Sequence, residues 1–365
     1  MKIGILTHYD VNNQGAQLQL YASYMQLTEM GYEPIVLTYK KNYDFEPSLE
    51  RRNQITITSI PYIIKNFLLS KGIGLTSHNV KKFLINRKFR IKHFMHGSYS
   101  LTNVAAAIVG ADEVFSLELG ANMMMYGHGV NTDKMIAYAP SIGQTDLKRI
   151  EKYHCKELIS SGLNRFIALS ARDIHTKNII EILTGREAEI VCDPALLYKF
   201  PLSEIQLPKG TPGKNYIVVY SYDARFVAPD EVKEISEYAK KHNLLTVSVG
   251  TYHKWCDVNI ACDPLQWLKC IQNAKAIVTD TFHGTIASII TQCPMALYYS
   301  PTVNSNKMLD LIERTELQDR KLNALSCEEL DRIFKQSINF IELEKRIERF
   351  RDLSLNYLKS ALQSI

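Results

Sequence analysis

Apolar segments of strand length alternate with segments of helical periodicity along most of the chain. The strand-length segments are nearly continuous in apolar character, which is typical of parallel strands covered by helices on both faces. The pattern therefore predicts an α/β protein built on parallel sheets. The strands are expected at residues 3–7, 34–39, 105–110, 135–139, 166–170, 189–192, 216–221, 245–249, 276–279 and 295–299.

The helical segments have readable ends. Residues 14–30 predict a helix that stops at Gly31, with Pro34 soon after. Residues 174–184 predict another, which stops at Gly185. The last 38 residues of the 365 have helical periodicity and no strand-like run, so they predict terminal helices that pack back across the protein.

Residues 198–215 are rich in proline and glycine and predict a linker. Six of the predicted strands precede this linker, and four follow it. A chain of 365 residues also exceeds the usual size of a single core. We therefore expect two Rossmann-like domains, residues 1–197 and 216–327, that face each other across a cleft, followed by C-terminal helices at 328–365. Open α/β sheets bind ligands at the carboxyl ends of their strands, so chemistry is expected in the loops that follow the strands.

The composition argues against several classes of protein and site. The net charge of +5 is modest for this length and indicates no nucleic-acid partner. Seven cysteines without a CxxC pair favour a reducing compartment over a disulfide framework or a structural zinc site. No apolar run reaches the roughly 20 residues of a membrane span, and the N-terminus has no signal-peptide core. We expect a cytoplasmic protein with no metal site and no resident cofactor; the scattered histidines, His8 among them, are expected to be structural.

Residues 65–93 form a basic segment with eight Lys and Arg and no Asp or Glu, interleaved with apolar residues. One interpretation is a basic amphipathic insertion that lies on an anionic membrane surface, with the protein peripheral to the inner membrane face. The other is a solvated helix whose apolar side packs on its own domain, because any surface helix is amphipathic.

The strongest local signal for chemistry is at residues 276–288. A buried strand ends there near Thr279 and an apolar helix begins near Gly284, which places His283 where free backbone N–H groups favour an anion. Gly284 lets the backbone approach a ligand closely. His283 itself can bind phosphate when protonated or pass a proton to a leaving group. The alternative is that Asp280 caps the helix and His283 only completes the turn.

Two further strand ends carry charged residues. Arg172 follows the strand predicted at 166–170, and its guanidinium can grip a phosphate or carboxylate through two parallel hydrogen bonds. The alternative is a surface ion pair between Arg172 and Asp173. Asp193 precedes Pro194 after a strand, and we interpret it as a turn former.

The first and third strand ends are polar. Asp10, Asn12 and Asn13 follow the first strand and are candidate ligands for the hydroxyl groups of a sugar. Their loop matches neither a Walker P-loop nor a GxGxxG fingerprint. Asp112 or Glu113 is a candidate general base toward a sugar hydroxyl, and Asp112 is equally suited to cap a following helix.

Five blocks together resemble a known family. The sequence VTDTFHG at 278–284 is similar to the (T/S)-D-(S/T/R)-(F/L)-H-G signature of the polysaccharide pyruvyl transferases. Four other blocks follow the family's order and approximate spacing over about residues 1–322, excluding the basic segment. They are residues 4–19, VGADEVF at 109–115, IAYAPSIG at 136–143, and SARD at 170–173 with DP at 193–194.

The resemblance implies a GT-B-like arrangement of two domains. It implies phosphoenolpyruvate as donor and, as acceptor, a sugar of a surface polysaccharide or exopolysaccharide, or of its lipid-linked precursor. The product would be a cyclic pyruvate ketal, with phosphate released. Carried over by position, Arg172 and His283 bind the donor, and the backbone at Thr281 and Phe282 helps to hold the anion.

The sequence departs from the family pattern on the expected acceptor side. Ala111, Glu113 and Phe115 stand where Ser, Gln and Trp are usual, and Gln14 stands where Tyr is common. Two other functions remain open on the sequence. One is a GT-B glycosyltransferase that uses a nucleotide sugar, because it has the same architecture. The other is a non-catalytic family member within a polysaccharide-assembly complex.

Overall fold

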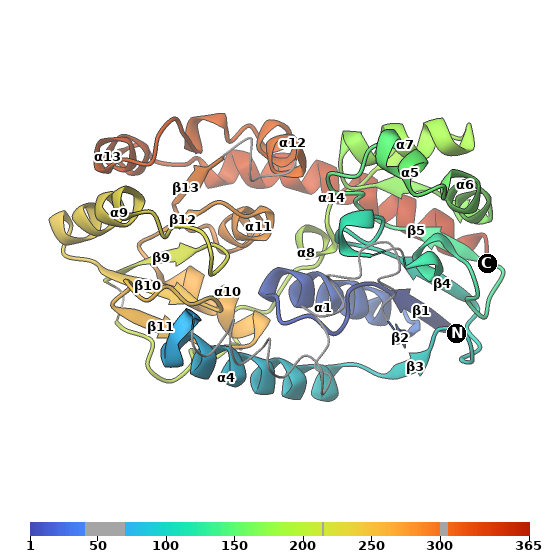
Figure 1. Ribbon diagram of the computed structural model, residues 1–365, viewed down its shortest axis with the longest axis horizontal. Helices are drawn as coiled ribbons and strands as arrows, with labels where there is room; N and C mark the ends of the chain where they lie inside the picture. Colours follow the sequence, from blue (N-terminus) through green and yellow to red (C-terminus); the bar gives the residue numbers. More distant parts are fainter. Residues whose placement is uncertain (41–69, 121, 214, 300–305) are drawn as a thin grey trace.

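Two six-stranded parallel sheets form the centres of two lobes in the computed structural model, which describes residues 1–40, 70–120, 122–213, 215–299 and 306–365 (Figure 1). The first sheet contains β1 (Lys2–Leu6), β2 (Glu33–Thr38), β3 (His96–Ser98), β4 (Ala106–Val109), β5 (Met135–Ala137) and β6 (Phe166–Ala168). The second contains β9 (Tyr216–Tyr220), β10 (Leu245–Val249), β11 (Val258–Ile260), β12 (Ala276–Thr279), β13 (Met295–Tyr298) and β14 (Lys321–Leu322). A small parallel pair joins β7 (Ser170–Ala171) to β8 (Glu189–Ile190).

Both sheets have the same strand order. The first runs β3-β2-β1-β4-β5-β6 and the second β11-β10-β9-β12-β13-β14, so each follows the doubly wound 3-2-1-4-5-6 order. The order reverses between β1 and β4 in one sheet and between β9 and β12 in the other. The central strands are buried apart from Lys2 at the start of β1, as Ile5 in β1 and Val218 in β9 show. The predicted α/β fold with two Rossmann-like units is confirmed.

The differences from the predicted strands lie at the sheet edges. The segment predicted at 189–192 pairs with β7 and does not join the first sheet. The prediction missed β3, β11 and β14, which have three, three and two residues. Strands this short carry too little pattern to detect, and His96-Gly97-Ser98 contains no apolar residue at all.

Helices cover the sheets, and polar side chains fix where several of them begin. Asn13 caps α1, Asp173 caps α7 and Thr281 caps α11, each through a side-chain oxygen that accepts a backbone N–H of the first turn. The helices are α1 (Gln14–Glu29), α4 (Ser70–His93), α5 (Leu147–Lys152), α6 (Lys156–Asn164), α7 (Ile174–Thr184), α8 (Pro194–Leu197), α9 (Pro229–Lys241), α10 (Pro264–Asn273), α11 (Phe282–Thr291), α12 (Asn306–Thr315), α13 (Cys327–Lys335) and α14 (Phe340–Gln363).

Besides α4, the described residues pass between the lobes at two places. The first passage follows α8, where the structure assigns no helix or strand to residues 198–213. The second is α14, which runs from the second lobe back along the first (Figure 1). There Tyr357 donates a hydrogen bond to the Ala137 carbonyl (2.8 Å), and Ser354 accepts one from the Cys192 N–H (2.8 Å). The prediction that C-terminal helices pack back across the protein is confirmed.

The basic segment forms a helix that lies against both lobes. Its residues 65–69 lie outside the described residues, and the rest belongs to α4, which runs along the lower edge of the molecule in Figure 1. Phe89 packs on Tyr21 of α1, and His78 packs on Tyr252 of the second lobe, with ring centroids 5.6 and 5.5 Å apart. No helix in the described part of the chain is long and apolar enough to cross a membrane.

Candidate active site

A cavity of about 830 Å³ lies between the two sheets, at the loops that follow β1, β4, β9 and β12. These four strands flank the two reversal points, where doubly wound sheets bind ligands. Helices α4 and α12 complete the wall. The lining includes His8, Asn12, Asn13 and Gln14 after β1; Asp112 and Glu113 after β4; Ser221, Tyr222, Asp223 and Arg225 after β9; Asp280, Thr281, Phe282 and His283 after β12; Lys82 from α4; and Lys307 from α12.

The start of α11 forms one wall of this cavity. The Thr281 hydroxyl accepts the Gly284 N–H (2.9 Å), so the helix begins at Phe282. The N–H groups of Phe282 and His283 belong to the first turn, which has no intrahelical acceptors for them. Together with the positive end of the helix dipole, they favour an anion at this point of the cavity.

The structure adds three details to the sequence analysis at α11. The helix begins two residues before Gly284, and its cap is Thr281. Asp280 does not cap it; its carboxylate accepts a hydrogen bond from Arg225 (2.9 Å). Gly284 does not line the cavity, because its missing side chain faces the hydroxyl of Thr279, which a Cβ atom would overlap. Glycine there allows α11 to pack on β12 and does not serve the approach of a ligand.

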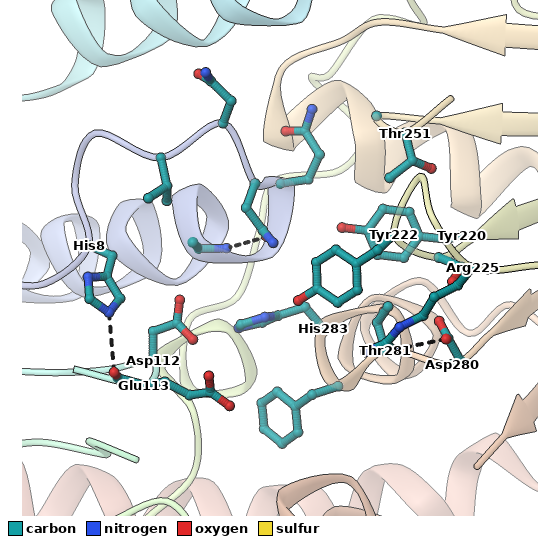
Figure 2. A pocket seen from close by; sticks show the side chains of 18 of the residues that line it. His8, Asp112, Glu113, Tyr220, Tyr222, Arg225, Thr251, Asp280, Thr281 and His283 are labelled. Carbon is teal, nitrogen blue, oxygen red and sulfur yellow. Dashed lines mark hydrogen bonds and ion pairs between the residues drawn. The ribbon is translucent and has the colours of Figure 1, made fainter. Parts of the chain in front are cut away.

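His283 points from α11 across the cavity toward Asp112 (Figure 2). The residue is only 8% exposed, and its Nε2 lies 3.5 Å from Oδ2 of Asp193. On its other side, the imidazole lies against Gly15 of α1, where a Cβ atom would overlap the ring. The ring comes from α11 of the second lobe and is therefore fixed between the start of α1 and two carboxylates, all of the first lobe.

Arg172 lies behind the cavity wall and does not line the cavity. Its guanidinium is buried, donates a hydrogen bond from Nη1 to Asp193 (2.9 Å), and stacks on the ring of Phe282 at 4.4 Å. The alternative of a surface pair with Asp173 is wrong, since Asp173 caps α7. The structure thus brings Arg172 and His283 to the same carboxylate, with Phe282 between Arg172 and the open space.

Asp193 is the residue whose role the sequence interpretation underestimated. Its Oδ1 caps α8, as expected of a turn former, but its Oδ2 holds Arg172 and faces His283. Burial raises the pKa of Asp193, and the neighbouring His283 and Arg172 outweigh that effect, so the net shift is downward. A charged carboxylate at this point orients the Arg172 guanidinium and the His283 imidazole.

Asp112 and Glu113 face His283 from the opposite wall (Figure 2). No helix follows Asp112, whose φ is 75°, so the capping alternative is wrong. Burial raises its pKa, but the charges of His283, Arg172 and Lys307 lower it well below the usual range, and Asp112 is ionised. Glu113 accepts a hydrogen bond from Lys307 (2.8 Å).

Only some of the predicted acceptor residues line the cavity. Asn12 and Asn13 line the cavity, although the Asn13 side chain also caps α1. Asp10 does not line it; the residue is exposed, and its charge opposes the effect of burial on the pKa of Arg90 in α4. His8 lines the cavity instead, with Nε2 3.2 Å from the Glu113 carbonyl oxygen.

The sequence analysis did not assign several cations to the cavity. Lys307 is at the start of α12, Arg225 follows β9, and Lys82 is in the basic helix α4. Glu113 and Asp112 raise the pKa of Lys307 and overcome the lowering effect of its burial. Each of these cations reaches the cavity through tertiary packing, which no local pattern indicates.

This architecture of two doubly wound domains around a cleft is the GT-B fold. A structure described as a UDP-N-acetylglucosamine 2-epimerase from Listeria monocytogenes aligns with a TM-score of 0.51 and 10% identity over 100% of this chain and 96% of that one. The UDP-N-acetylglucosamine 2-epimerase from Methanocaldococcus jannaschii gives 0.48 and 14% over 93% of each chain, and that from Neisseria meningitidis 0.49 and 11% over 100% of each. At 10% identity, the likeness to the Listeria monocytogenes structure shows the fold alone.

The family follows from the sequence match. A family model described as polysaccharide pyruvyl transferase matches residues 13–300. The chain therefore belongs to the polysaccharide pyruvyl transferase family, and the resemblance drawn from its motifs is confirmed. A comparison with curated proteins returns no match.

Proposed function

We propose that this protein transfers the pyruvyl unit of phosphoenolpyruvate to a sugar and releases phosphate. The observation that carries the proposal is the start of α11, which presents His283 and two first-turn N–H groups to the cavity of a polysaccharide pyruvyl transferase family member. A cavity of about 830 Å³ has room for this small donor beside a sugar.

The donor phosphate is assigned to the amides of Phe282 and His283. Arg225 and Lys307 line the same cavity, and both carry acidic partners, Asp280 and Glu113. An incoming phosphate competes with Glu113 for Lys307, so donor binding frees a carboxylate on the acceptor side. Arg172 acts from behind the wall, where its charge stabilises the ring of Phe282 and the carboxylates around His283.

The reaction then needs three proton transfers, two C–O bond formations and one C–O cleavage. A proton adds to C3 of the donor, which becomes the methyl carbon, and one sugar hydroxyl attacks C2 and loses its proton. The bond from C2 to the phosphate oxygen breaks, the second hydroxyl closes the ketal ring, and its proton leaves with the phosphate. We assign protonation of C3 to His283 and acceptance of a hydroxyl proton to Asp112, which lines the cavity and faces the imidazole.

A panel of ligands tests the donor class. Phosphoenolpyruvate at about 100 times its dissociation constant should stabilise the protein by about 2.7 kcal/mol, seen as a rise in melting temperature. UDP-sugars at the same concentrations should give no shift. Stabilisation by UDP-sugars alone would instead indicate a glycosyltransferase, and stabilisation by phosphoenolpyruvate without phosphate release on any glycan would indicate a non-catalytic family member.

Gly15 provides a test of how tightly His283 must be held. A Gly15→Ala side chain would overlap the imidazole, and a displacement of about 1 Å at a reacting group lowers turnover by about 100-fold. The measurement is phosphate release from phosphoenolpyruvate with acceptor present. Gly213→Ala is the matched control, because no atom lies within 4 Å of the added carbon. Equal rates for the two variants would contradict the assigned position of the ring.

A further inference from the structure

Helix α4 buries a polar side against the protein. Every third or fourth residue from 75 to 89 faces inward, and three of these five side chains are polar. Lys82 reaches the cavity between the lobes, where burial lowers its pKa and the charge of Asp223 opposes that effect. The inward side chains are Leu75, His78, Lys82, Asn86 and Phe89.

The outward side of the same helix is apolar. Ile73, Val80, Leu84 and Ile91 are 80, 54, 55 and 68% exposed. At 100° per residue these four side chains lie within about 40° of one another, so they form a single line along the helix. Phe83, 45% exposed, lies on one flank of this line.

Cations border the apolar line on both flanks, and acids are missing from the surrounding sequence. Lys81, Lys88 and Lys92 lie on one side, and Arg87 on the other, all exposed. The sequence contains no Asp or Glu from residue 51 to residue 111. An ordinary surface helix turns its apolar face inward and its polar face to water, and α4 does the reverse.

We propose that the outward face of α4 binds the surface of an anionic lipid bilayer, with the helix parallel to the membrane plane. Apolar side chains then enter the boundary between head groups and acyl chains, while lysine and arginine pair with anionic head groups. The charge of the face selects this partner, because a neutral protein surface would leave four cations without counter-charges. The protein lies on the membrane and does not span it.

One consequence rests on the proposed function. The helix that faces the bilayer also supplies Lys82 to the wall of the cavity, so the cavity is held one helix diameter, about 10 Å, from the lipid surface. A sugar attached to a lipid carrier reaches a cavity at that height. We therefore assign the acceptor to the class of lipid-linked saccharides.

Vesicle flotation of the full chain, residues 41–69 included, tests the surface. The protein should float with vesicles that contain phosphatidylglycerol, and not with pure phosphatidylcholine vesicles. The double variant Leu84→Glu/Ile91→Glu should partition at least tenfold more weakly. The control variant Ile182→Glu/Leu353→Glu places the same charges at exposed apolar positions of α7 and α14, 61 and 66% exposed, and should bind as the unmodified protein does.

Several outcomes would overturn the inference. In the vesicle experiment, they are absence of flotation, equal binding to neutral vesicles, and an equal loss of vesicle binding in the control variant. In light scattering without lipid, the contradicting result is a dimer that the α4 variant abolishes. The thermal shift with phosphoenolpyruvate separates this result from the proposed function. A protein that is stabilised by the donor but does not float refutes the membrane surface alone, and one that floats without donor stabilisation refutes the pyruvyl transfer alone.

Discussion

Replacing His283 with alanine is expected to lower phosphate release from phosphoenolpyruvate by a factor of about 10² to 10⁴, the usual contribution of a general acid. The side chain lies at the start of α11, points across the cavity, and is held by Gly15 on one side and Asp193 on the other. The backbone N–H groups of α11 remain in the variant. Donor binding, measured by thermal shift, should therefore fall less than turnover does.

The control for this variant is His154→Ala, an exposed histidine outside the cavity lining. Both proteins should have the circular dichroism spectrum and melting temperature of the unmodified protein without ligand. A His283→Ala enzyme that retains more than a tenth of the unmodified rate would contradict the assignment of the imidazole to proton transfer.

The second large effect concerns stability. Asp193→Asn removes the charge that pairs with the buried guanidinium of Arg172, and breaking such a pair from one side costs about 3–5 kcal/mol. Unfolding in urea measures this loss as a change in the free energy of unfolding. The matched control is Asp133→Asn, because the Asp133 carboxylate is fully exposed and lies 3.9 Å from its partner, Arg165. A loss of less than about 1 kcal/mol at Asp193 would show that Arg172 does not depend on this carboxylate.

The pH dependence of the same variant gives an independent measurement. The pKa of Asp193 is lowered in the folded state, so its stabilising effect is present above the ordinary aspartate pKa of about 4 and is lost as the pH falls further. Asp193→Asn has no such group to protonate. Its stability should therefore fall less between about pH 4 and pH 2 than that of the unmodified protein.

The sequence predicted the layers of this fold well because parallel strands buried on both faces are nearly continuous apolar runs. Residues 216–220 and 276–279 belong to such runs, and both are central strands. The sequence did not predict the edge strands β3, β11 and β14, because a strand of two or three residues is too short to show a hydrophobic pattern. The strand order itself depends on crossovers between distant segments, and periodicity carries no information about them.

The site was predictable where it follows a strand. His283 and Asp112 come directly after β12 and β4, and they meet because the carboxyl ends of both sheets open on the same cavity. Lys307 could not be assigned in this way. Asp193 does follow a strand, but its role, like that of Lys307, depends on which side chains of other segments it contacts. Asp10 is the opposite case, because it is in the right loop but does not line the cavity.

A crystal structure of the complex with phosphoenolpyruvate would locate the donor. We expect its phosphate oxygens to accept hydrogen bonds from the backbone N–H groups of Phe282 and His283, and its C3 to lie next to the imidazole. A donor bound elsewhere in the protein, with the start of α11 occupied only by water, would contradict this expectation.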